Sequence, residues 1–103
     1  MSGATAIGFA ACEKPDRYIQ QLVKHWGHNM PTSYSDGIGA FPFSEHTNAA
    51  MQAVPGGIGI TLTTADAEEN LRMRSVIEHH IDRFAFREAP LTYEWNDPKE
   101  SER

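Results

Sequence analysis

Residues 47–64 read TNAAMQAVPGGIGITLTT, and the rest of the fold can be worked out from this stretch. Two alternating runs, 47–54 and 58–64, flank the Pro-Gly-Gly of residues 55–57, a composition typical of a tight turn between strands. In the second run, isoleucine and leucine alternate with glycine and threonine. This period of two predicts a hairpin in a sheet that buries one apolar face and leaves the other face polar.

Upstream of the hairpin, the sequence predicts a strand followed by a helix. Residues 5–11 alternate between larger and small side chains, as in a strand with one buried face. Pro15 is suited to the first position of a helix, where its missing N–H costs nothing, and Asp16 complements the positive helix end. Apolar residues then recur at helical spacing as far as Trp26, and Gly27 is a suitable terminator. The predicted helix has about three turns.

Between that helix and the hairpin, the sequence predicts two further strands. Residues 30–34 are a weak strand candidate, and Asp36-Gly37 behind them supplies the positive φ angles of a tight hairpin turn. The strand over 38–43 contains Pro42, which lacks a backbone donor. A proline there confines this strand to an edge or a bulge of the sheet.

The last third of the chain predicts a second helix and a final strand. The helix begins at Thr64 or Asp66, both good N-caps, and runs to about Phe84. Alternation over 91–95 predicts a half-buried strand, and the polar residues 97–103 predict a disordered tail.

The predicted fold is of the α+β class, with a single domain over residues 1–96. Its order is strand, helix, three or four strands, helix, strand, which favours a two-layer arrangement. We expect an antiparallel-rich sheet of five to six strands with both helices on one face, a layout similar to the repeat of the TATA-binding protein.

Length, charge and cysteine content narrow the classes of function. The chain has 103 residues and a formal net charge of -5, from nine basic and fourteen acidic groups. This balance argues against nucleic acid and anionic membrane surfaces as partners, and no apolar stretch has the length of a membrane span. The single cysteine excludes an internal disulfide and fits a reducing compartment, so we expect the cytoplasm.

The histidines supply the first candidate site. His25 and His28 lie three residues apart at the end of the first helix, where two imidazoles can approach one metal or one anion. The alternative is that His25 is a packed, hydrogen-bonded residue beside the apolar stripe. Glu45-His46 falls in a loop between strands, where functional groups often lie. His80 falls on the apolar face of the second helix, where a satisfied core histidine is the expected reading.

Two arginines supply the second candidate site. Arg83 and Arg87 are four residues apart at the end of the second helix, so both guanidinium groups could present one anion-binding edge. The alternative is a helix terminus with cations placed favourably against its negative end.

Several of these segments resemble the bacterial family catalogued as domain of unknown function 2218 (DUF2218). The resemblance rests on Arg17-Tyr18, Gln21-Leu22, the HWGH of residues 25–28 and the RFAFRE of residues 83–88, and it extends from about Thr5 to Trp95. It implies a stand-alone cytosolic protein, since related domains are attached to, or encoded near, flavin-dependent siderophore-interacting reductases. The candidate ligand-binding residues, taken from the site arguments and this resemblance together, are His25, Trp26, His28, Arg83 and Arg87.

Together these observations predict a non-catalytic accessory or ligand-binding module. The resemblance links it to siderophore and iron handling, with a small molecule or a protein such as a siderophore-interacting reductase as partner. One alternative is a metal-dependent enzyme or metal-binding protein that uses His25 and His28, with His46 as a third ligand. The other is a structural homodimer formed through an edge strand near Pro42 or the open sheet face. No cofactor is evident from the sequence, although a bound metal is open.

Overall fold

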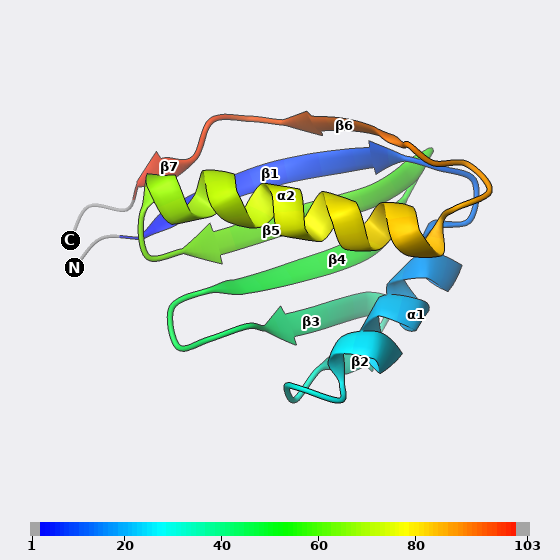
Figure 1. The fold of residues 1–103 in the computed structure, drawn as a ribbon, viewed down its shortest axis with the longest axis horizontal. Coiled ribbons are helices and arrows are strands. Elements are labelled where there is room, and N and C mark those ends of the chain that lie inside the picture. Colours follow the sequence, from blue (N-terminus) through cyan, green and yellow to red (C-terminus); the bar gives the residue numbers. More distant parts are fainter. Residues whose placement is uncertain (1–2, 101–103) are drawn as a thin grey trace.

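The computed structural model describes residues 3–100 and has two layers, a sheet and a pair of helices (Figure 1). The alternating and helical patterns form the predicted elements, so the α+β prediction is confirmed. In chain order the elements are β1 (Ala4–Ala11), α1 (Pro15–Trp26), β2 (Ser33–Ser35), β3 (Ile38–Pro42), β4 (Asn48–Val54), β5 (Gly57–Thr64), α2 (Ala67–Phe84), β6 (Thr92–Trp95) and β7 (Lys99–Glu100).

The sheet is antiparallel throughout and is centred on the predicted hairpin. Its order is β2-β3-β4-β5-β1-β6, and β7 pairs with β1. In the hairpin, Asn48 lies opposite Thr63 and Val54 opposite Gly57, while Gly56 takes a positive φ of 87° in the turn. Long-range pairing of β1 with both β5 and β6 brings the two ends of the chain together.

Both helices cover one face of the sheet, and the core lies between the layers. The hydrophobic residues of α1 and α2 repeat at helical spacing, so each helix buries one stripe. Burial of each large aliphatic side chain contributes about 1.5–3 kcal/mol. The fully buried large apolar side chains are Ile19, Leu22, Phe41, Met51, Ile58, Ile60, Leu62, Ile77 and Ile81.

The two helices begin differently. At α2, Asp66 Oδ1 accepts a hydrogen bond of 2.8 Å from the Glu69 N–H, the expected N-cap. At α1, Lys14 occupies the N-cap position and makes no side-chain cap bond. The N–H groups of the first turn of α1 therefore have no side chain that caps them, and the positive end of the helix remains available to an anion.

Five side chains fasten β6 to α2, and we call them the β6 clamp. Tyr93 Oη donates to Asp82 Oδ1 at 2.7 Å, and Trp95 Nε1 donates to Glu78 Oε2 at 2.8 Å. The Arg74 guanidinium carbon lies 5.0 Å from the centre of the Trp95 ring, within range of a cation–π interaction. Burial and the bond to Asp82 raise the pKa of Tyr93, so this hydroxyl remains a donor.

The other face of the sheet is open. Strands β1 to β5 contain no Asp, Glu, Lys, Arg or His. On the open face, the side chains of Ile7 and Ile38 are 51% and 41% exposed. A shallow groove of about 270 Å³ runs between these two isoleucines, across β4 and β5.

The end of the chain differs from the predicted disordered tail. β6 pairs only with Gly8 to Ala11, which leaves the backbone groups of Ala4 and Thr5 without a neighbour on that side. β7 pairs with those two residues, so Lys99–Glu100 is ordered by the sheet edge. The remainder of the predicted tail, residues 101–103, lies outside the described residues. Neither α1 nor α2 has the length and apolar character needed to cross a membrane.

Candidate functional site

The basic side chains of this acidic chain are concentrated where α1 meets the end of α2. These two helices pack against each other, and the segments 14–28 and 79–87 carry more than half of the Lys, Arg and His residues. Local positive charge in an acidic protein indicates a place where an anion would be attracted. The residues are Lys14, Arg17, Lys24, His25, His28, His79, His80, Arg83 and Arg87.

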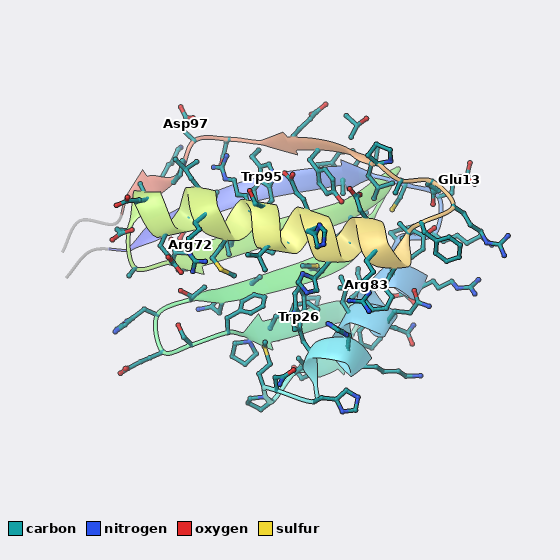
Figure 2. The ribbon with its side chains drawn as sticks, viewed as in Figure 1. Glu13, Trp26, Arg72, Arg83, Trp95 and Asp97 are labelled. Carbon is teal, nitrogen blue, oxygen red and sulfur yellow. The ribbon has the colours of Figure 1, made fainter. Side chains whose placement is uncertain are left out.

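A cleft of about 600 Å³ opens at this end of the molecule, and we call it the cationic cleft. It lies between the start of α1 and the turn that follows α2, next to Glu13 (Figure 2). Its volume falls within the range of small-molecule sites in proteins. The lining residues are Glu13, Lys14, Arg17, Tyr18, Gln21, Phe84, Phe86, Arg87 and Glu88.

Glu88 holds the two sides of the cleft together. Its carboxylate accepts hydrogen bonds of 3.0 and 3.2 Å from the Glu13 N–H and one of 2.6 Å from Tyr18 Oη. The hydrogen bond to Glu88, with burial as a smaller cause, raises the pKa of Tyr18 to about 12. Tyr18 therefore stays protonated and continues to donate at neutral pH. This part of the cleft wall is structural.

The cations of the cleft are not used in this way. Among the described residues, Lys14, Arg17 and Arg87 make no ion pair and no side-chain hydrogen bond. The Arg87 guanidinium carbon lies 5.8 Å from the centre of the Phe86 ring. With the uncapped start of α1, these side chains place positive charge around one volume, an arrangement suited to an anion.

Gln21 adds an acceptor without a donor. It lines the cationic cleft, and its Oε1 atom is buried with no hydrogen-bond partner in the described part of the chain. A buried polar atom left unpaired costs about 1–3 kcal/mol. Such atoms call for a specific explanation, and a donor on a bound molecule is one.

The histidines behind the cleft form an aromatic cluster. The ring centre of His25 lies 5.4 Å from that of His80 and 5.5 Å from that of Phe84, and the His80 and Trp26 centres are 4.7 Å apart. His80 Nδ1 lies 2.8 Å from the Val76 carbonyl oxygen. Figure 2 places Trp26 below the C-terminal half of α2, where α1 approaches it. The packed interpretation of His25 and the satisfied interpretation of His80 agree with this geometry.

Burial and charge both act on His25. Desolvation lowers its pKa most, and His80, Arg83 and His28 lower it further. His25 is therefore neutral at pH 7 and has the character of a packed ring more than that of a cation.

The three histidines proposed as metal ligands are not gathered into one site. His28 is exposed just beyond the end of α1. His46 is exposed in the loop between β3 and β4, where its Nε2 lies 3.9 Å from Glu45 Oε1. Within residues 3–100, no three His, Cys, Asp or Glu side chains are arranged to hold a metal ion.

Arg83 and Arg87 do not share a helical edge. α2 ends at Phe84, and Arg87 lies in the following turn, in which the Ala89 N–H donates to the Ala85 carbonyl. Arg87 lines the cleft, whereas Arg83 is near His25 and is not part of the lining. The helical spacing assumed from the sequence was wrong because the helix stops before Arg87.

Cys12 lies close to the cleft but is poorly suited to nucleophilic chemistry. Burial, with the nearby Glu88 carboxylate as a second cause, raises its pKa to about 11. The thiol is therefore protonated at neutral pH, and the thiolate is the reactive form.

Comparison with known proteins places the chain in a family. No protein with a curated description matches it. It is similar to PA4090 from Pseudomonas aeruginosa, solved by NMR, with 25% sequence identity and a TM-score of 0.75 over 90% of this chain and 95% of that chain. The family described as "Uncharacterized protein conserved in bacteria (DUF2218)" matches residues 8–96. Since that match spans most of the sequence, the chain belongs to the DUF2218 family, as its HWGH and RFAFRE segments predicted.

Proposed function

We propose that this protein is a non-catalytic binding module of the cytoplasm that holds a small anion in the cationic cleft. The observation that carries the proposal is the set of three cations, Lys14, Arg17 and Arg87, that line one cleft without a protein partner. Solvated cations alone are common on protein surfaces. Three of them around one volume, beside an uncapped helix start, provide both charge and backbone donors for an anion.

The chemistry of the neighbouring groups supports binding over catalysis. His80 Nδ1 faces the Val76 carbonyl oxygen, and His25 is packed among aromatic rings with a lowered pKa. The Cys12 thiol is held in its protonated form. Each of these groups is positioned as a structural residue, and none is prepared to transfer a proton or attack a substrate.

The family resemblance suggests a setting for such a module. Siderophores bind ferric iron through deprotonated oxygen groups, so an anionic siderophore, or a fragment of one, belongs to the ligand class proposed here. We propose an accessory role beside a siderophore-interacting reductase. Co-purification of such a reductase with the tagged protein from its native host would support this role, and retention of the same reductase by an Arg17→Gln, Arg87→Gln variant would place the contact outside the cleft.

The experiment for the binding function is an NMR titration of the full chain at low salt with sodium benzoate. We expect saturable shifts of the Arg17, Gln21 and Arg87 amide signals, and their loss in the Arg17→Gln, Arg87→Gln variant. Arg72→Gln is the matched control, because Arg72 pairs with Glu69 at 2.6 Å at the far end of α2. Absence of any saturable shift at these positions would overturn the proposal. Stoichiometric Zn²⁺ or Fe²⁺ binding that is lost in a His25→Ala, His28→Ala variant would favour the metal-binding alternative.

The open sheet face favours a second role, a homodimer. Two copies can meet there without opposing charges, because strands β1 to β5 are uncharged and Ile7 and Ile38 are exposed. Five strands at a spacing of about 4.8 Å, each about seven residues long, present roughly 550 Å² per copy. The total of roughly 1,100 Å² is close to the lower limit for a specific interface, so a weak dimer is expected.

Sedimentation velocity over a range of concentrations tests the dimer. We expect reversible association at micromolar to millimolar concentrations that Ile7→Asp abolishes. Leu71→Asp is the control, since Leu71 is 54% exposed on α2, on the other layer. A monomer at every concentration would reject this role.

A further inference from the structure

The walls of the cationic cleft carry aromatic rings as well as charge. Phe84 and Phe86 line the same volume as Lys14, Arg17 and Arg87. The side chain of Phe86 is 70% exposed, the largest value among the large hydrophobic residues that the structure describes. An inorganic anion would neutralise the cations and leave this ring in water.

The exposed ring has a physical use if the ligand has an apolar body. Burial of apolar area is favourable by about 25 cal/mol per Å², and aromatic pairs gain further energy from offset or edge-to-face contact. The guanidinium of Arg87 lies near the Phe86 ring, so one flat ligand could contact the ring with its body and the cation with its acid group.

The charges of the cleft define how acidic the ligand should be. Lys14, Arg17 and Arg87 contribute three positive charges, and Glu13 and Glu88 contribute two negative charges to the same lining. The balance is a single positive charge. A monoanion therefore suits this site better than a dianion, which the two carboxylates would repel.

We infer that the ligand of the cationic cleft is an aromatic monocarboxylate, an inference that rests on the binding function proposed above. Its acid group lies among the three cations and its ring lies against Phe86. A hydroxyl or amino substituent on the ring would also supply the donor that the buried Oε1 of Gln21 lacks. The cleft volume of about 600 Å³ leaves room for a substituted ring.

The test compares probes that differ in one property at a time. The full chain is titrated by NMR with acetate, cyclohexanecarboxylate, benzoate, 2-naphthoate and inorganic phosphate at constant ionic strength. We expect affinity to rise from acetate through cyclohexanecarboxylate and benzoate to 2-naphthoate, with benzoate about threefold to tenfold tighter than cyclohexanecarboxylate. Phosphate should bind more weakly than benzoate because it is largely dianionic.

Variants separate the ring from the charge. Phe86→Leu keeps an apolar side chain at an exposed position, so the fold should persist while the preference for benzoate over cyclohexanecarboxylate disappears. Leu71→Ala, on the same helix layer and outside the cleft lining, should retain the preference. Arg87→Gln should weaken all carboxylates together.

The outcomes distinguish the two proposals. If none of the probes binds at the cleft, the binding function fails and this inference fails with it. If the carboxylates bind with equal affinity, or if Phe86→Leu leaves the preference intact, the anion site stands and the aromatic inference is overturned. Tighter binding of phosphate than of benzoate would also overturn it.

Discussion

The cationic cleft and the β6 clamp contain the same kinds of side chain and differ in how those side chains are partnered. In the clamp, Arg74, Glu78 and Asp82 each meet an aromatic residue of β6. In the cleft, Arg17 and Arg87 lie beside aromatic rings and have no partner of opposite charge among the described residues. The difference separates two uses of the same chemistry, because satisfied groups hold the fold and unsatisfied groups are available to a ligand.

The largest expected effect is on the clamp. Asp82→Ala removes the acceptor of both Tyr93 Oη and the Leu91 N–H, which leaves two partly buried donors unpaired. We expect a loss of about 2–3 kcal/mol in the free energy of unfolding, since bonds to charged groups are worth about 1.5–3 kcal/mol each and part of the loss is recovered by water. Urea denaturation followed by tryptophan fluorescence measures it. The neighbouring Arg83→Gln should stay within about 0.5 kcal/mol of the parent protein. Equal losses in the two variants would remove the distinction between clamp and cleft.

The second effect is on the cleft and has the opposite profile. Arg17→Gln combined with Arg87→Gln removes two charges without breaking a contact within the protein. We expect benzoate affinity to fall about tenfold or more, which corresponds to the roughly 1.4 kcal/mol of one charge-assisted interaction. The free energy of unfolding should change by less than about 0.5 kcal/mol. The same urea and NMR measurements apply to both variants, and a destabilised double variant would mean that the arginines are structural.

The sequence predicted the elements of the fold because their signals are local. The Pro-Gly-Gly turn, the alternation on either side of it and the Asp66 cap each depend on neighbouring residues. The position of β1 between β5 and β6 could not be obtained in this way, because it joins residues far apart in the chain. Gly8 illustrates the limit. A Cβ atom there would lie 2.6 Å from the ring of Trp95, so this glycine is required by a strand at the other end of the sequence.

The candidate site was predictable only in part for the same reason. His25, Arg83 and Arg87 were chosen on helical spacing, which groups residues of one helix and cannot group residues of two. The cleft combines Lys14 and Arg17 with side chains that follow α2, about 70 positions later in the sequence. The ring of Phe86 carried a usable signal, since it lies outside the apolar stripe of α2 and is flanked by the arginines.

A smaller effect is expected where the cleft wall is itself structural. Glu88→Gln removes the charged acceptor of Tyr18 Oη while keeping a polar side chain of similar size. The hydrogen bond to Glu88 is the largest cause of the raised pKa of Tyr18, so the variant should titrate below the parent value of about 12. Absorbance at about 295 nm between pH 9 and 13 follows tyrosinate formation, and Tyr18→Phe identifies the contribution of this residue. Loss of one negative charge from the cleft should also strengthen benzoate binding severalfold. An unchanged titration would show that burial, and not Glu88, controls Tyr18.

The smallest effect concerns His25, whose packing links the cleft to the core. Its pKa is lower in the folded protein than the ordinary value of 6.5, so the unfolded chain binds more protons between the lowered pKa and pH 6.5. Stability therefore rises with pH across that interval, and this contribution is lost as the pH falls. His80, Arg83 and His28 face His25 and resist its protonation. Urea denaturation at pH 7.5 and pH 5.5 should give a smaller difference for His25→Gln than for the parent protein, whereas His46→Gln, in an exposed loop, should keep the parent difference. If both variants kept it, proton uptake at His25 would not be coupled to folding, and the aromatic cluster would be a packing feature independent of the charge beside it.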